Sequence, residues 1–454
     1  MKLFLNKKTI KFLLLYTLIA FLEVTFLFFI ENEYHSIAFL SILQLILNMI
    51  TLIITFKRNS MYGCIFLIFS WIFHCGQLII KGYDFNVQII FDVIKYASFG
   101  AIVKSFQYYY ISQIFLVFGI LISNVILFSN KKDKVIKEMN YKKVAFFLLI
   151  IGIIPRIYID VTQLIGGISK GYSGVYSLIV PQIVQTFAFF FDASMIFYLF
   201  TVDNHKQKIL FLFITIYKLL MMMTGARQEK LVFLIMWFYT YYFLIKEVKL
   251  ITVIKLVIVG YFGISFIYSI GSLRVAESIN LLEVISNTFI PNSKIFGELL
   301  AEFGSALNSL AITVYKIPYI IEYGFGKSYL AAILSIVPKL VSFFPTLNSN
   351  INYVSLFKGT TYFGGSYIGE LYYNFGMYSS VLLLIFGYFL GKIQTNMTKS
   401  ISESKNKIKK ILAVIIGIYL ILFIRGYFSD FVQKIVWLYL FVYLINKFSF
   451  KKER

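Results

Sequence analysis

Arginine is rare in this sequence and occurs at particular places. Of the 43 lysine and arginine residues, only six are arginines. A planar guanidinium binds phosphate oxygens through two hydrogen bonds and stays charged in a partly dry site. Four arginines beside apolar stretches therefore predict a diphosphate-binding site, although each could instead simply extend its charged end toward water. These four are Arg156, Arg227, Arg274 and Arg425.

The segment TGARQEK, from Thr224 to Lys230, favours anion binding on separate grounds. The apolar run before it, 209–223, would be only about 22 Å long as a helix. Because a bilayer core is roughly 30 Å thick, the turn is expected to dip below the membrane surface. The free N–H groups of the next helix, with Thr224 or Gly225 near its cap and Arg227 in its first turn, would then bind an anion. A plain tight turn at the headgroups is the alternative.

Three carboxylates are candidates for a general base that takes a proton from an attacking hydroxyl. Glu298 and Glu302 are four residues apart, so they would share one face of a helix. Glu370 lies in GGSYIGELYYNFG, between a glycine-rich turn and an apolar run. The alternative for each is a solvated loop carboxylate without a catalytic role.

Aromatic residues make up 19% of the chain. Tyrosine rings can stack on the apolar C–H faces of sugars, but they are also typical of the aromatic belts at membrane interfaces. Position in the sequence leaves both interpretations open. The candidate substrate-binding residues are those that follow Glu370 in the same segment, Tyr372, Tyr373 and Asn374.

Several kinds of chemistry have no motif in the sequence. The three histidines are scattered, and no HExxH, Walker A, GxSxG or zinc-site spacing occurs. The two cysteines, Cys64 and Cys75, lie in one apolar run and are expected to pack there. We therefore expect neither a metal nor another cofactor.

The composition predicts an all-α, polytopic integral membrane protein. Hydrophobic residues are 59% of the chain and charged residues 14%, far from the balance of soluble domains. The net charge of +22 would suggest nucleic acid in a soluble protein, but here the lysines flank apolar runs and no nucleic-acid partner is expected. We predict a single membrane domain, 1–454, with about twelve spans at 10–30, 36–56, 61–80, 108–128, 144–160, 178–200, 209–223, 228–245, 251–270, 376–391, 411–424 and 431–446.

The distribution of lysine predicts the topology. With both termini in the cytoplasm, the inner segments carry most of the positive charge on the shorter length of chain, as the positive-inside rule requires. The four arginines then lie at the outer ends of spans. A large extracytoplasmic loop, 271–375, separates spans nine and ten. Within it, 329–345 is expected to be interfacial or re-entrant because Pro338 and Lys339 interrupt it, and 87–106 is interpreted in the same way.

Four segments resemble a known family. They are MTGARQEKLVF, FGELLAEFGSALNSLAITVYKIP, YGFGKSYLAAILSIVPK and, most of all, GGSYIGELYYNFGMYSSVLLLIFGYFLG. Together with about a dozen spans and one large late loop, they are similar to the Wzy-type O-antigen and capsule polymerases of bacteria. The resemblance covers roughly 220–392 by motif and the remainder by topology. Arg227 and Glu370 match the family motifs best.

The resemblance implies a reaction and its partners. Repeat oligosaccharides linked through diphosphate to undecaprenol would be polymerised on the outer face of the cytoplasmic membrane. The growing chain would pass from its lipid diphosphate to a sugar hydroxyl of the next lipid-linked unit. Partners would then be these donor and acceptor lipids, the bilayer, and possible pathway proteins such as a chain-length regulator and a flippase.

Two other functions stay open from the sequence. A polysaccharide ligase, or another lipid-linked glycosyltransferase, shares the donor chemistry and the overall architecture. A lipid-linked oligosaccharide flippase or transporter would instead carry charged residues within several spans and show two similar halves. The loop predicted between spans five and six, 161–177, is short for this family, which leaves the location of the acceptor site open.

Overall fold

The computed structural model describes residues 3–5, 7–29, 33–89, 91–128, 140–177, 180–222, 227–246, 255, 260–263, 265, 295–337, 340–344, 353–357, 364–399 and 404–449. Two three-residue strands, β1 (Leu3–Leu5) and β2 (Ile126–Phe128), pair antiparallel with Leu3 opposite Phe128. The other regular elements of the described chain are helices. The predicted fold class, an all-α polytopic membrane protein, is confirmed.

Within the described residues, six apolar helical stretches are long enough to cross a membrane. One of them, Tyr34–Gly82, consists of two helices that the sequence predicts as separate spans. Helix α6 (Gln182–Leu199) is apolar but shorter, and the predicted span 251–270 lies mostly outside the described residues. The number twelve therefore stays a prediction. The six stretches are Ile10–Leu27, Tyr34–Gly82, Phe99–Val125, Tyr141–Gly166, Met377–Met397 and Phe428–Lys447.

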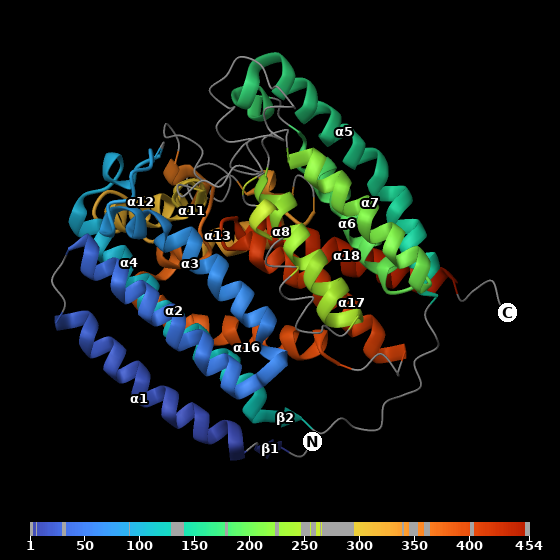
Figure 1. The fold of residues 1–454 in the computed structure, drawn as a ribbon. Coiled ribbons are helices and arrows are strands. Elements are labelled where there is room, and N and C mark those ends of the chain that lie inside the picture. Colours follow the sequence, from blue (N-terminus) through green and yellow to red (C-terminus); the bar gives the residue numbers. More distant parts are fainter. Residues whose placement is uncertain are drawn as a thin grey trace. The chain divides into compact units, whose positions relative to one another are not determined.

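The chain forms two compact units. Figure 1 shows the helices of both, coloured along the sequence. Unit 1 comprises residues 1–136, 296–401 and 419–432, and unit 2 comprises 137–295, 402–418 and 433–454. Helices α17 (Ser404–Phe423) and α18 (Phe428–Ser449) contribute residues to both units.

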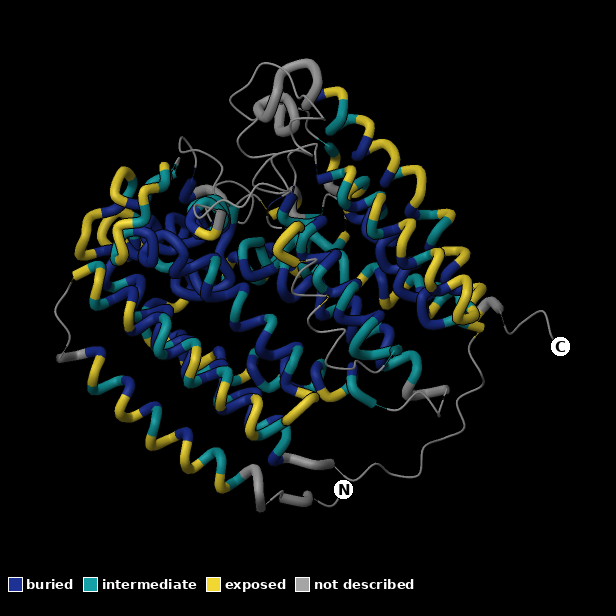
Figure 2. Tube along the Cα trace, in the orientation of Figure 1, coloured by how far each residue is buried: buried dark blue, intermediate teal, exposed yellow. Residues whose placement is uncertain are grey.

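Unit 1 is built on the hydrophobic helices α1 (Lys7–Phe29), α2 (Tyr34–Phe56), α3 (Met61–Gly82) and α4 (Phe99–Val125). A short 3₁₀ turn, η1 (Lys57–Ser60), reverses the chain between α2 and α3. Large apolar side chains of α1, for example Leu18 and Phe21, are exposed, as a lipid-facing helix requires. Exposed positions recur along α1 in Figure 2.

Helix α4 packs closely against α16 (Leu383–Met397), which follows the 3₁₀ helix η7 (Met377–Leu382). A Cβ atom added at Gly119 would meet the Leu384 carbonyl oxygen at 2.1 Å, and one at Gly387 would meet the Leu116 carbonyl oxygen at 2.0 Å. The hydrophobic effect contributes little to helix association in apolar lipid, so membrane helices associate through close van der Waals packing. Small residues such as these glycines allow that close approach.

The predicted interfacial segment 87–106 is partly wrong. Residues 93–95 form a 3₁₀ turn, η2 (Val93–Lys95), but α4 already begins at Phe99 and runs unbroken to Val125. The Asp92 side chain caps η2 and forms a 2.8 Å ion pair with Lys81. Helix α4 is continuous through Lys104, and the Nζ of this lysine lies 5.8 Å from the ring centroid of Tyr319.

The described parts of the predicted loop 271–375 consist of short helices and turns. They include α12, which is buried from Ala306 to Val314 and contacts α3, α4 and α15. The segment 329–345 includes most of α13 and the whole of η5, both too short to cross a bilayer. The elements are α11 (Ile295–Phe303), α12 (Ala306–Lys316), α13 (Lys327–Leu334), η5 (Leu340–Phe343), η6 (Tyr353–Phe357) and α15 (Tyr367–Phe375).

Unit 2 contains α5 (Tyr141–Ser177), α6 (Gln182–Leu199), α7 (Asn204–Met222), α8 (Arg227–Phe238) and the π-helix η3 (Tyr239–Ile245). The predicted loop 161–177 is wrong, because α5 continues through these residues. A helix satisfies its own backbone groups, and this outweighs the weak helix preference of glycine there.

Candidate functional site

The Glu370 carboxylate lies at a junction of three elements of unit 1. Glu370 is in the first turn of α15 and only 3% exposed. Its Oε1 accepts a 2.9 Å hydrogen bond from the Ser328 hydroxyl on α13, and its Oε2 accepts one of 2.9 Å from the Phe428 backbone N–H. Phe428 is the first residue of α18, where N–H groups lack partners within the helix. The carboxylate therefore caps α18 from a distant part of the sequence.

Burial raises the pKa of the Glu370 carboxyl to about 7. The hydrogen bonds from Phe428 and Ser328 favour the ionised form and lower the pKa, whereas the neighbouring Asp430 raises it further. A carboxyl with a pKa near 7 can take up a proton at neutral pH and release it again. This is the property required of a general base.

Asn374 fixes the surroundings of Glu370. Its Nδ2 donates to the Ser328 hydroxyl at 2.7 Å and to the Glu370 carbonyl at 2.8 Å, and its Oδ1 accepts from the Gly326 N–H at 2.9 Å. Gly326 has φ +81°, a conformation that suits glycine and lets the chain enter α13. Asn374, predicted to bind substrate, thus connects α13 to α15.

A buried histidine supports the start of α15. His74 Nδ1 lies 3.0 Å from the Ser70 carbonyl, which can only accept, so Nδ1 donates this hydrogen bond. Nε2 lies 2.8 Å from the Ser366 hydroxyl, and Ser366 Oγ accepts the Gly369 N–H as the N-cap of α15. The position of Glu370 therefore depends on a helix cap that is held from α3.

Arg425 lies close to the same junction. The Gly365 N–H donates to the Arg425 carbonyl at 3.2 Å. A Cβ atom at Gly364 would meet the Arg425 side chain at 3.3 Å, and Gly364 also has φ +79°. Tyr427 interacts electrostatically with Asp430, Glu370 and Arg425. Two residues predicted from the sequence, Glu370 and Arg425, thus lie on adjoining segments of unit 1.

Tyr372 and Tyr373 are 1% and 3% exposed and pack against protein rings. Tyr372 lies edge-on to Tyr108 with centroids 5.0 Å apart, and Tyr373 lies 5.9 Å from Tyr353. Glu298 and Glu302 lie one turn apart on α11, as their spacing predicts.

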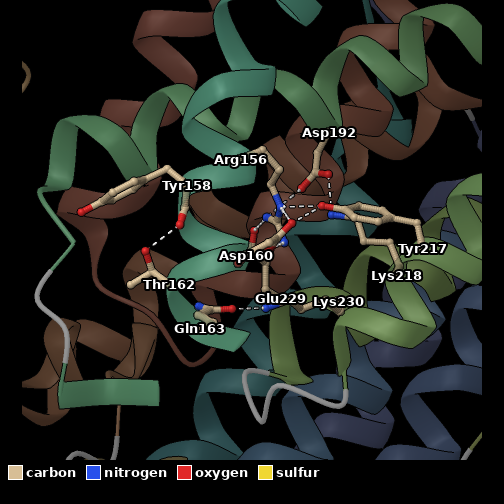
Figure 3. Close-up of polar contacts among 10 residues, drawn as sticks. All are labelled: Arg156, Tyr158, Asp160, Thr162, Gln163, Asp192, Tyr217, Lys218, Glu229 and Lys230. Atoms are coloured by element: carbon tan, nitrogen blue, oxygen red, sulfur yellow. Dashed lines mark hydrogen bonds and ion pairs between the residues drawn. The ribbon is translucent and has the colours of Figure 1, made fainter. Parts of the chain in front are cut away.

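In unit 2, charged side chains from α5, α6, α7 and α8 meet in what we call the ionic cluster (Figure 3). Arg156 is its centre: Nε and Nη2 contact Asp160 at 3.0 and 2.9 Å, and Nη1 lies 3.2 Å from Glu229 and 3.9 Å from Asp192. The guanidinium is therefore held by carboxylates on three helices. The cluster comprises Arg156, Asp160, Gln163, Asp192, Tyr217, Lys218, Glu229 and Lys230.

The remaining contacts of the cluster join the same helices. Lys218 Nζ forms a 2.5 Å ion pair with Asp192, and both side chains are almost fully buried. Lys230 Nζ donates to Gln163 at 2.8 Å, and the Tyr217 hydroxyl donates to Asp160. Cations and carboxylates are equal in number here, so the cluster is electrically balanced.

Arg227 is the first residue of α8 and is 2% exposed. It lies in unit 2 with Arg156, whereas Arg425 lies in unit 1. Three further predicted residues, Thr224, Gly225 and Arg274, lie outside the described residues. The diphosphate-binding role assigned to these residues stays a prediction.

Four residues that the structure places in these two regions were not predicted from the sequence: His74, Ser328, Asp192 and Lys218. Asp192 and Lys218 carried a usable signal, because ionisable residues inside apolar runs are rare and usually paired. No feature of the sequence distinguishes His74 or Ser328, since their partners are distant in the sequence. No group of three or more His, Cys, Asp or Glu side chains that could hold a metal ion occurs in the part of the chain that is described.

Comparison with protein families gives one result that covers the chain. The family model described as O-antigen polysaccharide polymerase Wzy matches residues 10–453. Comparisons with curated proteins and with solved structures found no match. Since the family match spans nearly the whole sequence, this chain belongs to the O-antigen polysaccharide polymerase Wzy family.

Proposed function

We propose that this chain is a glycosyltransferase that polymerises undecaprenyl-diphosphate-linked repeat units into O-antigen, capsule or exopolysaccharide on the outer face of the cytoplasmic membrane. Membership of the polymerase family and the apolar helices support polysaccharide polymerisation in a membrane. The orientation with both termini in the cytoplasm belongs to this proposal and is supported by the distribution of lysine.

In the proposed reaction, a sugar hydroxyl of the acceptor attacks the anomeric carbon of the donor chain. A new C–O bond forms, the bond to the lipid diphosphate breaks, and its electron pair leaves with the diphosphate oxygen. The hydroxyl proton passes to the general base. No nucleotide is needed, because the diphosphate already activates the donor sugar.

Glu370 is the proposed base, and its contacts carry the proposal. Its Oε1 already accepts a hydrogen bond from a hydroxyl, that of Ser328 at 2.9 Å. The acceptor hydroxyl would replace Ser328 at this oxygen and make the same kind of bond. Because the Phe428 N–H holds the other oxygen, the carboxylate stays oriented during the exchange. Glu298 and Glu302 stay as alternative bases.

Arginines are proposed to bind diphosphate. The donor and the acceptor each carry a lipid diphosphate, so more than one cationic site is required. Arg425, next to the Glu370 junction, and Arg227, at the N-terminus of α8, are the proposed ligands. A guanidinium in a partly dry site stabilises the charge that develops on a departing diphosphate. Arg274 shares this proposed role from its sequence position.

The glycan profile of a deletion strain tests this function. We expect long surface polysaccharide to disappear while single lipid-linked repeats still reach the outer face. Continued synthesis of polymer that stays on its lipid carrier would instead identify a ligase. Single repeats that stay on the inner face would identify a flippase.

A further inference from the structure

The ionic cluster of unit 2 holds both sides of the connection between α7 and α8. On the α7 side, Tyr217 donates to Asp160 of α5, and Lys218 pairs with Asp192 of α6. Lys218 Nζ also lies 4.5 Å from the ring centroid of Phe233, which is on α8. The last turns of α7 are therefore attached to three neighbouring helices.

On the α8 side, the attachment begins two residues after Arg227. Glu229 accepts from Arg156 Nη1 at 3.2 Å, and Lys230 donates to Gln163 at 2.8 Å. Both partners are on α5. Arg227, as the first residue of α8, therefore takes its position from a helical turn that α5 holds in place.

Net stability alone does not explain such a cluster. Taking charges out of water opposes the attraction between them, so buried ion pairs often give no more stability than apolar residues of similar size. They do impose geometry, because a planar guanidinium bonds only along fixed directions. Arg156, with carboxylate contacts on α5, α6 and α8, sets the relation between these helices.

We propose that Arg156 is a positioning residue that acts through Glu229 and Asp160 to hold the first turn of α8 where Arg227 can bind a diphosphate. This inference rests on the proposed function of Arg227. It gives Arg156 a role different from the diphosphate contact that the sequence predicts, because carboxylates already surround its guanidinium.

A double-mutant cycle on the purified full-length chain, supplied with lipid-linked repeat units, tests whether Arg156 affects activity through Arg227. Arg156→Lys is expected to lower kcat/KM about tenfold, mainly through a rise in KM, because charge is kept but the fixed geometry is lost. With Arg227→Lys already present, Arg156→Lys should lower kcat/KM by less than about twofold. Equal losses in both backgrounds would overturn the proposal, since Arg156 would then act independently of Arg227.

Hydrogen exchange of the α8 backbone gives a readout that needs no activity. Arg156→Lys and the milder Tyr217→Phe are both expected to speed exchange about tenfold at residues 231–234, whose N–H groups bond to the carbonyls of the first turn of α8. Lys81→Gln, which breaks an ion pair of unit 1, is the matched control and should leave this exchange unchanged. Unchanged exchange in both test variants would overturn the proposal. Faster exchange together with full activity of Arg227→Lys would support positioning of α8 and remove Arg227 from the proposed diphosphate site.

Discussion

Glu370 and Phe428 are 58 residues apart in sequence, and the Glu370 carboxylate accepts the Phe428 N–H at 2.9 Å. This bond joins the first turn of α15 to the first turn of α18. It also brings Glu370 close to the turn that contains Arg425. A candidate base and a candidate diphosphate ligand are thus connected through the backbone.

Replacement of Glu370 by glutamine tests the base directly. The amide can still accept one hydrogen bond, but it cannot take up a proton, so we expect polymerisation to fall by at least about 100-fold while substrate binding is kept. Product formation from lipid-linked repeats and binding of the same lipid are measured side by side. The exposed Glu322→Gln in the same unit is the control. Retained product formation would show that Glu370 caps α18 and is not the base.

The pH dependence of polymerisation follows from the raised pKa of Glu370. Burial favours the neutral carboxyl, so the base is protonated and inactive below about pH 7 and ionised above it. The initial rate should therefore rise about tenfold per pH unit below pH 7 and level off above it. A rate that does not change between about pH 6 and about pH 8, roughly one unit either side of this pKa, would argue for another base.

Arg227→Lys is expected to impair polymerisation by about 10- to 100-fold although the positive charge is kept. An ammonium cannot reproduce the two parallel hydrogen bonds of a guanidinium to phosphate oxygens. Kinetics with lipid-linked repeats, at matched expression in membranes, are the measurement. Arg58→Lys, at the exposed turn between α2 and α3, serves as the control. Full activity of the Arg227 variant would exclude this residue from the diphosphate site.

Asp192→Asn is expected to destabilise the protein by about 3–5 kcal/mol, because it leaves the Lys218 ammonium buried without its closest partner. The double variant Asp192→Leu, Lys218→Met should recover much of this loss, since neither charge is then buried. Thermal unfolding in detergent compares the variants. If the single and double variants unfold at the same temperature, the pair is not a unit of stability.

The sequence by itself determined the membrane class and the main apolar helices. A bilayer admits helices of about 20 apolar residues, so α1, α2, α3 and α16 can be recognised from local composition alone. The same local information selected Glu370 and Arg425, because an ionisable residue next to a turn or at the end of an apolar run stands out. Family membership also follows from residue order, without any knowledge of contacts.

Tertiary structure decided which of these residues meet. The bonds of Glu370 to Ser328 and Phe428 join segments 42 and 58 residues away, and no local pattern encodes such pairings. Helix α5 continues through the predicted loop 161–177, because its backbone pairs within the helix despite glycines that usually mark turns. Arg156 shows the same limit, because no local pattern predicts that the packing of α5, α6 and α8 brings carboxylates to its guanidinium.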